Sequence, residues 1–259
     1  MHPWHDQLDD TPLHAWTAGD GPPLWALHGT GGSGKVWFHQ SRRFAERWRV
    51  VAPDLPGYGQ SGHPESVRSV DDIAGWLARW LPRLSSSPAV VMGHSMGGRV
   101  ALQLALEHPE LVRALVLVNA SGLDLPEAPA RSPKALGPEG FIRALYHRPS
   151  ARSLEAAVRE ADRWWPTLER LTRVPLRRDW QERLGDVRVP TLVVWGTEDG
   201  LIPWAHALAF RDGIPRARLH PVPDSGHVPM LERPGEVNRA LAAFLDELDA
   251  PVLQEGETP

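Results

Sequence analysis

Short runs of apolar residues recur along the chain, separated by polar and small residues. Each run has five or six residues and is mostly apolar on both faces, without a regular alternation of apolar and polar positions. The six runs are residues 24–28, 49–53, 89–93, 114–118, 191–195 and 217–222. Runs of this kind are typical of strands covered on both faces, as in a parallel sheet flanked by helices. We therefore expect six strands of a mostly parallel sheet.

Between and after these runs, apolar residues follow a helical period. The clearest patterns are residues 70–84, 96–107 and 234–248. The first precedes the third predicted strand, the second lies between the third and fourth predicted strands, and the last closes the chain. Strands alternating with helices predict an α/β class and a doubly wound sheet.

The strand rhythm stops between residues 121 and 185. This segment predicts a loop and then helices at 139–146, 154–165 and 168–184, with breaks at Pro149, Pro166 and Pro175. Its twelve basic and nine acidic residues give it a net charge of +3, against −7 for the rest of the chain. We interpret 121–185 as a helical insertion in a core formed by 1–120 and 186–259.

Composition narrows the chemistry. A chain of 259 residues with 42% hydrophobic residues suits one domain with an inserted subdomain. The absence of cysteine excludes disulfides, iron–sulfur clusters, cysteine zinc sites and a thiol nucleophile. The net charge of −4 and the lack of a stripe of basic residues do not indicate nucleic-acid binding. With no apolar run of 18 residues and no signal-peptide pattern, we expect a cytoplasmic protein without a membrane span.

A serine stands at the junction between a predicted strand and a predicted helix. The third run leads into Gly93-His94-Ser95-Met96-Gly97-Gly98, and a helical pattern follows directly. Small residues two before and two after Ser95 allow a sharp turn that projects its hydroxyl at the helix N-terminus. We predict Ser95 as a nucleophile. The alternative is that Ser95 only caps the helix in a glycine-rich turn. That interpretation does not explain the carboxylate and histidine described next.

A serine nucleophile needs a base that is itself held by a carboxylate. Asp199 and His227 each follow a predicted strand, so we expect both at the carboxyl edge of the sheet, where Ser95 lies. Asp199 is the favoured acid and His227 the base. Asp224, three residues before His227, and Asp124, shortly after another strand, are the alternative acids.

Two further motifs accompany this serine turn. They are His28-Gly29-Thr30-Gly31-Gly32 and the D-x-x-G-x-G-x-S segment from Asp54 to Ser61. Together with the Ser95, Asp199 and His227 loops, they resemble the serine-hydrolase branch of the α/β-hydrolase superfamily over essentially the whole chain. The resemblance implies an α/β-hydrolase fold, an oxyanion hole formed by the backbone N–H groups of Thr30 and Met96, and a cap formed by 121–185. His28 and Asp54 are interpreted as residues that fix turns.

Aromatic and basic residues near these motifs are candidate substrate contacts. Trp37 follows the oxyanion turn, and Trp164 and Trp165 lie in the cap, where they suit an acyl or alcohol pocket. Arg99 lies one helical turn after Ser95 and could face a substrate carboxylate. The alternative for the tryptophans is packing in the core. The alternative for the arginines is a structural ion pair or a solvated surface. The positive cap above a negative body is compatible with an acidic substrate or an acidic carrier-protein partner.

We therefore expect a small-molecule ester as substrate, a monomer or homodimer, and no metal or organic cofactor, since the other histidines lack metal-ligand spacing. A haloalkane dehalogenase or epoxide hydrolase is disfavoured because Ser95 occupies the nucleophile position. The alternatives are a carbon–carbon hydrolase of the meta-cleavage type and a lyase similar to the SHCHC synthase of menaquinone biosynthesis, whose elbow S-x-G-G-R matches Arg99. Carbon–carbon hydrolases of this type usually have asparagine before the nucleophile and tryptophan soon after the base. This chain has His94 and Val228 near these positions, which weakens that alternative. A non-catalytic binding scaffold would not need Asp199 and His227.

Overall fold

The computed structural model describes residues 1–84, 87–148, 151–173, 177 and 179–249. In these residues one sheet has the strand order β1-β2-β4-β3-β5-β6-β7-β8. The first three neighbours, β1, β2 and β4, pair antiparallel, and all later pairs are parallel. The strand bounds are β1 His2–Leu8, β2 Thr11–Ala18, β3 Pro23–Leu27, β4 Arg49–Pro53, β5 Ala89–His94, β6 Val112–Val118, β7 Thr191–Gly196 and β8 Ala217–Val222.

The six predicted strands are confirmed, with bounds that differ by at most two residues. The hairpin of β1 and β2 was not predicted. Its strands carry histidine, aspartate, glutamine and threonine among their apolar residues, and β1 is largely exposed, so neither strand forms a continuous apolar run. β8 also differs from expectation, because it lies at the edge of the sheet and is only partly buried.

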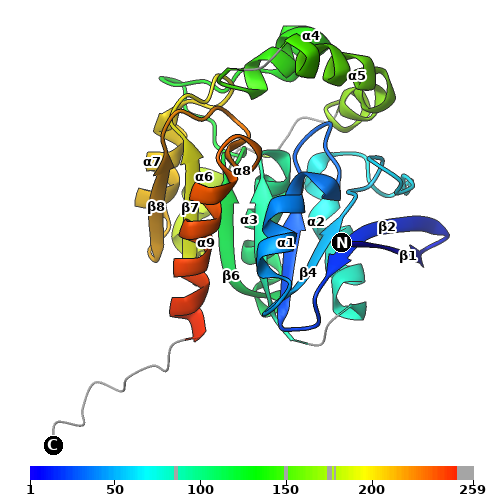
Figure 1. Ribbon diagram of the computed structural model, residues 1–259, viewed down its shortest axis with the longest axis vertical. Coiled ribbons are helices and arrows are strands. Elements are labelled where there is room, and N and C mark those ends of the chain that lie inside the picture. The colour runs from blue at the N-terminus through cyan, green and yellow to red at the C-terminus, as the bar shows by residue number, and fades with distance from the viewer. Residues whose placement is uncertain (85–86, 149–150, 174–176, 178, 250–259) are drawn as a thin grey trace, which may run out of the picture.

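Helices lie on both faces of the sheet, with α1 and α9 on one face and α2, α3 and α7 on the other (Figure 1). The helix bounds are α1 Phe38–Phe44, α2 Val70–Trp80, α3 Met96–Glu107, α4 Pro133–Leu145, α5 Ala151–Leu171, α6 Trp180–Arg183, α7 Trp204–Gly213, α8 Pro229–Glu232 and α9 Pro234–Asp249. Short 3-10 turns are η1 Gly34–Trp37, η2 Leu81–Arg83, η3 Pro109–Leu111 and η4 Leu184–Asp186.

Successive residues of the central strands enter two separate hydrophobic clusters. In β5, Val90 and Met92 belong to the cluster beneath α1 and α9, whereas Val91 belongs to the cluster beneath α2 and α3. Because side chains alternate across a strand, a run that is apolar at every position is covered on both faces. Because both faces of β5 are packed, the strand holds the start of the serine turn in a fixed position.

The segment between β6 and β7 contains α4, α5 and α6, and α4 and α5 lie over one end of the strands (Figure 1). α4 covers the predicted 139–146 helix but begins earlier, with a kink at Gly137, whose φ is +68°. The predicted helix 168–184 is wrong: α5 already ends at Leu171, and α6 is a single turn. Pro149 and Pro175 lie outside the described residues.

Pro166 does not break the helix as the sequence predicted, because α5 runs through it. Leu154, Ala161, Leu168 and Leu171 are buried along one face of α5 on both sides of the exposed Pro166. Burying a leucine side chain contributes about 1.5–3 kcal/mol. The burial of three such leucines contributes more free energy than the cost of about 3 kcal/mol for a proline within a helix. Packing therefore overrides the local preference.

None of the helices in the described part of the chain combines the length and apolar character that crossing a membrane requires.

Candidate active site

Ser95 lies at a strained turn between β5 and α3. Its φ of +52° and ψ of −118° are unusual for a residue other than glycine. A Cβ atom on Gly93 would lie 2.2 Å from the carbonyl oxygen of Gly97, and one on Gly97 would lie 2.4 Å from the carbonyl oxygen of Leu27. Both positions therefore require glycine. Strain of this kind persists only where the surrounding structure enforces it, and it is found at functional sites.

Backbone hydrogen bonds hold this turn in place. The N–H of Ser95 donates to Val118 at 3.0 Å, which joins the turn to the end of β6. The carbonyl oxygen of Ser95 accepts hydrogen bonds from Gly98, Arg99 and Ser121, at 2.9–3.1 Å. The serine backbone is thus fixed relative to both neighbouring elements.

His227 and Asp199 form a buried pair on the loops after β8 and β7. Nδ1 of His227 donates to Oδ2 of Asp199 at 2.8 Å, and both side chains are 1% exposed. Because Nδ1 carries the proton, Nε2 of His227 is left as a hydrogen-bond acceptor and base. His227 and Ser95 line the same cavity.

Asp199 is kept ionised by its surroundings. Burial alone would raise the pKa of Asp199, but the charge and hydrogen bond of His227, the N–H of Ile202 and the Asn119 amide hold it below its ordinary value. The Asn119 amide donates to Oδ2 at 2.6 Å, and the N–H groups of Leu201 and Ile202 donate to Oδ1 at 2.8 and 3.0 Å. An ionised, oriented carboxylate stabilises an imidazolium beside it.

The two alternative acids lie elsewhere. Asp224 is largely exposed, and its carboxylate is 3.7 Å from Nη2 of Arg233. Asp124 acts electrostatically on His206, and the hydrogen bond to Nδ1 of His227 comes from Asp199. The partner of His227 is therefore Asp199.

His28 fixes the glycine-rich turn that precedes the active site. Its Nε2 accepts a hydrogen bond from the N–H of Leu55 at 2.8 Å, so Nδ1 carries the proton and donates to Gly29 at 2.7 Å. Burial lowers the pKa of His28, which keeps this tautomer neutral. Thr30 lies in this turn, and its Oγ1 is 3.6 Å from the sulfur of Met96. The turn and the residue after Ser95 are thus in contact.

Asp54 fixes the same turn from behind. Its Oδ1 accepts the N–H of Gly34 at 2.7 Å, and Oδ2 accepts the N–H of Gln60 and Nδ1 of His14, each at 2.9 Å. Three separate segments therefore meet at this one carboxylate. Its position agrees with the turn-fixing role predicted from sequence.

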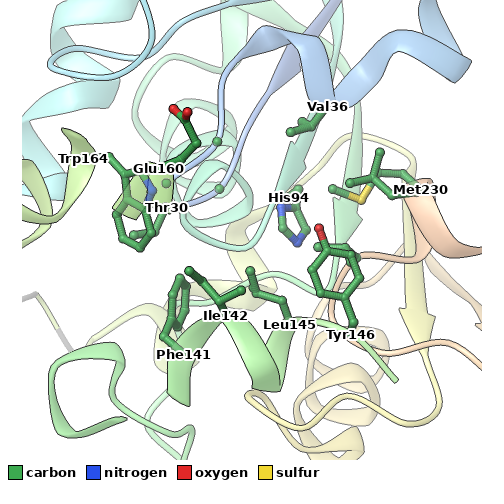
Figure 2. Close-up of a pocket in the computed structure, with 15 residues that line it drawn as sticks. Thr30, Val36, His94, Phe141, Ile142, Leu145, Tyr146, Glu160, Trp164 and Met230 are labelled. Atoms are coloured by element: carbon green, nitrogen blue, oxygen red, sulfur yellow. The ribbon is translucent and has the colours of Figure 1, made fainter. Parts of the chain in front are cut away.

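Two cavities lie against these groups. The first, of about 290 Å³, is called the serine chamber; among the residues lining it are Thr30, Tyr58, Ser95, Met96, Arg99, Arg131, Phe141, Leu168 and His227. The second, of about 180 Å³, is called the second chamber (Figure 2). Its lining is Gly29–Gly32, Val36, His94, Phe141, Ile142, Leu145, Tyr146, Glu160, Trp164, Val228, Met230 and Leu231.

Thr30 and Phe141 line both chambers, so the chambers adjoin at the glycine-rich turn. In Figure 2 the side chains of Phe141, Ile142, Leu145 and Tyr146 form one side of the second chamber, opposite His94. These residues come from α4 and the residue after it. The insertion thus supplies one wall of the space beside Ser95.

The four candidate substrate contacts separate into two groups. Trp164 lines the second chamber and Arg99 lines the serine chamber. Trp37 is fully buried in the cluster beneath α1 and α9, so it packs in the core and lines neither chamber. Trp165 also lines neither chamber; its Nε1 donates to Glu169 at 3.2 Å on the exposed side of α5.

Sequence reasoning missed Asn119, His94 and Arg131 as parts of the site. Asn119 follows β6 at its carboxyl end, as Ser95 follows β5, and this position was the available signal. His94 stands directly before Ser95 and is bonded to the carbonyl oxygen of His227 at 2.8 Å. Arg131 is one of the twelve basic residues counted in the insertion, but the sequence did not distinguish it from the others, and it lies in an irregular loop. In the described part of the chain, no cluster of three or more histidine or acidic residues could hold a metal ion.

Comparisons with known proteins show which family the chain is similar to. A model of the alpha/beta hydrolase family matches residues 26–240. A candidate carbamate hydrolase, RutD, of Azorhizobium caulinodans is 33% identical, over 93% of this chain and 97% of that protein. The 2-hydroxy-6-oxo-6-phenylhexa-2,4-dienoate hydrolase of Comamonas testosteroni is 29% identical, over 92% of each chain. A solved thermophilic esterase is 30% identical with a TM-score of 0.78, over 96% of this chain and 98% of that one.

Proposed function

The chain belongs to the alpha/beta hydrolase family, and we propose that it is a serine hydrolase that cleaves carboxylic esters. Ser95 is the nucleophile, His227 the general base and Asp199 the residue that orients and stabilises His227. The backbone N–H groups of Thr30 and Met96 form the oxyanion hole. Hydrolase relatives and a similar solved esterase support this proposal.

In the first half of the reaction, Nε2 of His227 takes the Ser95 proton while Oγ attacks the ester carbonyl. The carbonyl oxygen becomes an oxyanion and accepts the N–H groups of Thr30 and Met96. Asp199 stabilises the imidazolium that forms, and the imidazolium then gives its proton to the departing alcohol. Loss of one oxyanion donor in such a site lowers turnover by about 10²–10³. The product of this half is an acyl group on Ser95.

In the second half, water replaces the alcohol. Nε2 of His227 takes a proton from water as the hydroxide attacks the acyl carbonyl, and returns it to Ser95 when the carboxylic acid leaves. Every proton and leaving group is handled by the chain and the substrates, so the proposed reaction uses no metal or organic cofactor.

The observation that carries this proposal is the buried hydrogen bond of 2.8 Å between His227 and Asp199, beside the chamber that Ser95 lines from a strained turn. A binding scaffold would have no need for such a pair behind a serine. We also propose that residues 121–185 act as a cap over a core of 1–120 and 186–259. Phe141 and Leu168, which line the serine chamber, come from this segment.

The test is hydrolysis of 4-nitrophenyl esters from acetate to dodecanoate by the wild-type protein and Ser95→Ala. We expect hydrolysis with an optimum in chain length, and loss of activity in Ser95→Ala. Ser121→Ala is the matched control, because Ser121 lines the same chamber and keeps its backbone contact to Ser95. Ester hydrolysis that persists in Ser95→Ala, or no hydrolysis by folded wild-type protein, would contradict the proposal.

Carbamates are the second candidate substrates, favoured by the 33% identical carbamate hydrolase candidate. The same attack, oxyanion and proton transfers cleave a carbamate, with an amine or alcohol leaving. The ester series is therefore extended with phenyl carbamates and with a 2-hydroxy-6-oxodienoate, since a relative acting on that compound class is 29% identical. The highest kcat/KM among the three classes decides between ester, carbamate and carbon–carbon bond cleavage.

A further inference from the structure

Two arginines line the serine chamber, Arg99 and Arg131, and its lining among the described residues includes no aspartate or glutamate. The second chamber is mostly apolar. Its lining in the described part of the chain includes no lysine or arginine, and its one charged side chain is Glu160. Glu160 is exposed and pairs with Arg163 at 2.7 Å, so its charge is compensated, and of the two spaces the serine chamber is the one with a basic lining.

The charge of Arg99 is already compensated. Its Nε donates to Oδ1 of Asp71 at 2.8 Å, and Nη2 lies 2.8 Å from the same carboxylate. Nη2 also donates to the carbonyl oxygen of Arg177, and the guanidinium lies over the Trp180 ring at 5.3 Å. Arg99 thus acts as a structural residue between α2, α3 and the cap.

Arg131 is different. Its backbone N–H donates to Leu201 at 2.7 Å and its Nη1 donates to the carbonyl oxygen of Gly200 at 3.2 Å, so the residue is fixed on the loop after Asp199. Within the described ranges, no carboxylate lies within 4 Å of its guanidinium. Among the described residues, one of its five N–H donors is used, on a neutral oxygen. Arg131 is thus an exposed, positively charged residue at the lining of the cavity that contains Ser95, and its charge has no carboxylate partner among the described residues.

We infer that Arg131 binds a carboxylate carried by the substrate, so that the enzyme prefers esters bearing a free acid group over neutral esters of the same length. This inference rests on the proposed ester hydrolysis. The carboxylate lies in the serine chamber, and an apolar group lies in the second chamber against Phe141 and Trp164, away from Glu160. A guanidinium is suited to this role because it presents parallel N–H donors to both oxygens of a carboxylate.

The experiment compares mono-4-nitrophenyl adipate with 4-nitrophenyl hexanoate, which have equal chain lengths and differ in a terminal carboxylate. A second pair, 4-(benzoyloxy)butanoate and butyl benzoate, places the carboxylate on the alcohol half. Wild-type protein, Arg131→Gln and Lys134→Gln are compared. Lys134→Gln removes the same charge three residues away, from a side chain that does not line the serine chamber.

We expect the wild type to favour the acidic ester of at least one pair by about tenfold in kcat/KM. In Arg131→Gln this preference disappears through a higher KM for the acidic ester. Lys134→Gln keeps the preference, and added salt weakens it in the wild type. Equal loss for acidic and neutral esters in Arg131→Gln, or no preference in either pair, overturns the inference.

A binding measurement separates this inference from the proposed function. Titration calorimetry of Ser95→Ala with adipate is compared with the same titration of Ser95→Ala/Arg131→Gln. Weaker binding in the double variant supports the role of Arg131 even if no ester is cleaved. Equal binding in both variants overturns that role even if esters are cleaved.

Discussion

Nε2 of His94 donates a hydrogen bond of 2.8 Å to the carbonyl oxygen of His227, and the two imidazole rings lie 4.9 Å apart. His94 immediately precedes Ser95, so this bond joins the turn of the proposed nucleophile to the loop of the proposed base. Burial, reinforced by the nearby His227, lowers the pKa of His94 to about 3. His94 is therefore a neutral donor, and it adds no charge that would oppose an imidazolium on His227.

His94→Phe keeps a ring of similar size and removes this donor. The carbonyl oxygen of His227 then loses a buried partner, which costs about 1–3 kcal/mol, and the base is less well fixed. We expect kcat for a 4-nitrophenyl ester to fall about 10–100-fold, with a smaller change in KM. His94→Gln, which can still donate, recovers part of the loss. Unchanged kcat in a folded His94→Phe protein would show that the bond does not position His227.

The neutral state of His94 also predicts a dependence of stability on pH. In the folded protein His94 stays neutral down to about pH 3, whereas in the unfolded chain it binds a proton below about pH 6.5. Between these values the unfolded state holds more protons, so the free energy of unfolding falls as the pH is lowered from 6.5.

Glutamine does not titrate, so His94→Gln removes this contribution. Between pH 7 and pH 5, we expect the free energy of unfolding to fall by about 2 kcal/mol less in His94→Gln than in the wild type. Urea unfolding at both pH values measures the difference. His28, His63 and His206, whose pKa values are also lowered, are present in both proteins and cancel. Equal losses in the two proteins would mean that His94 is protonated in the folded state.

The geometry around His227 predicts opposite outcomes for two aspartates. Asp199→Asn replaces the carboxylate that accepts the Nδ1 proton, and an amide there favours the wrong tautomer of His227. We expect kcat for a 4-nitrophenyl ester to fall about 10³–10⁴-fold. Asp224→Asn is the matched control, because Asp224 is exposed and near Arg233, so activity stays within about twofold. A large loss in Asp224→Asn with a mild effect in Asp199→Asn would reverse the assignment.

The positions of Ser95, Asp199 and His227 could be predicted because each follows a strand, and the carboxyl ends of parallel strands meet at one edge of the sheet. The hairpin β1–β2 could not, because its strands mix polar with apolar residues and its pairing depends on β4. The length of α5 could not be predicted from the sequence either. Its burial on both sides of Pro166 exists only once the helix packs on the core.

The substrate contacts show where sequence reasoning stops. Trp164 and Trp165 are neighbours in α5, yet only Trp164 lines a chamber. Adjacent helical residues point in directions about 100° apart. Which of them faces the cavity depends on how the helix lies over the sheet, and the sequence does not state this.

These two tryptophans therefore form a natural comparison for the second chamber. A chamber of about 180 Å³ with apolar walls is large enough for a ring the size of benzene, since engineered apolar cavities of about 150 Å³ bind benzene. Trp164, which contacts the Phe141 ring edge to face at 5.8 Å, supplies part of this wall. If an aromatic half of the substrate lies here, truncating Trp164 removes its contact surface.

We expect Trp164→Ala to raise KM for phenyl hexanoate about tenfold, because aromatic contact and lost burial together contribute about 1–2 kcal/mol. Methyl hexanoate, whose alcohol half is too small to reach the wall, changes by less than about twofold. Trp165→Ala, the matched control, leaves both esters near wild-type values. Steady-state kinetics on the two esters, with thermal melting to verify folding, measures this. Equal effects on phenyl and methyl esters in Trp164→Ala would show that Trp164 stabilises the cap without contacting an aromatic substrate group.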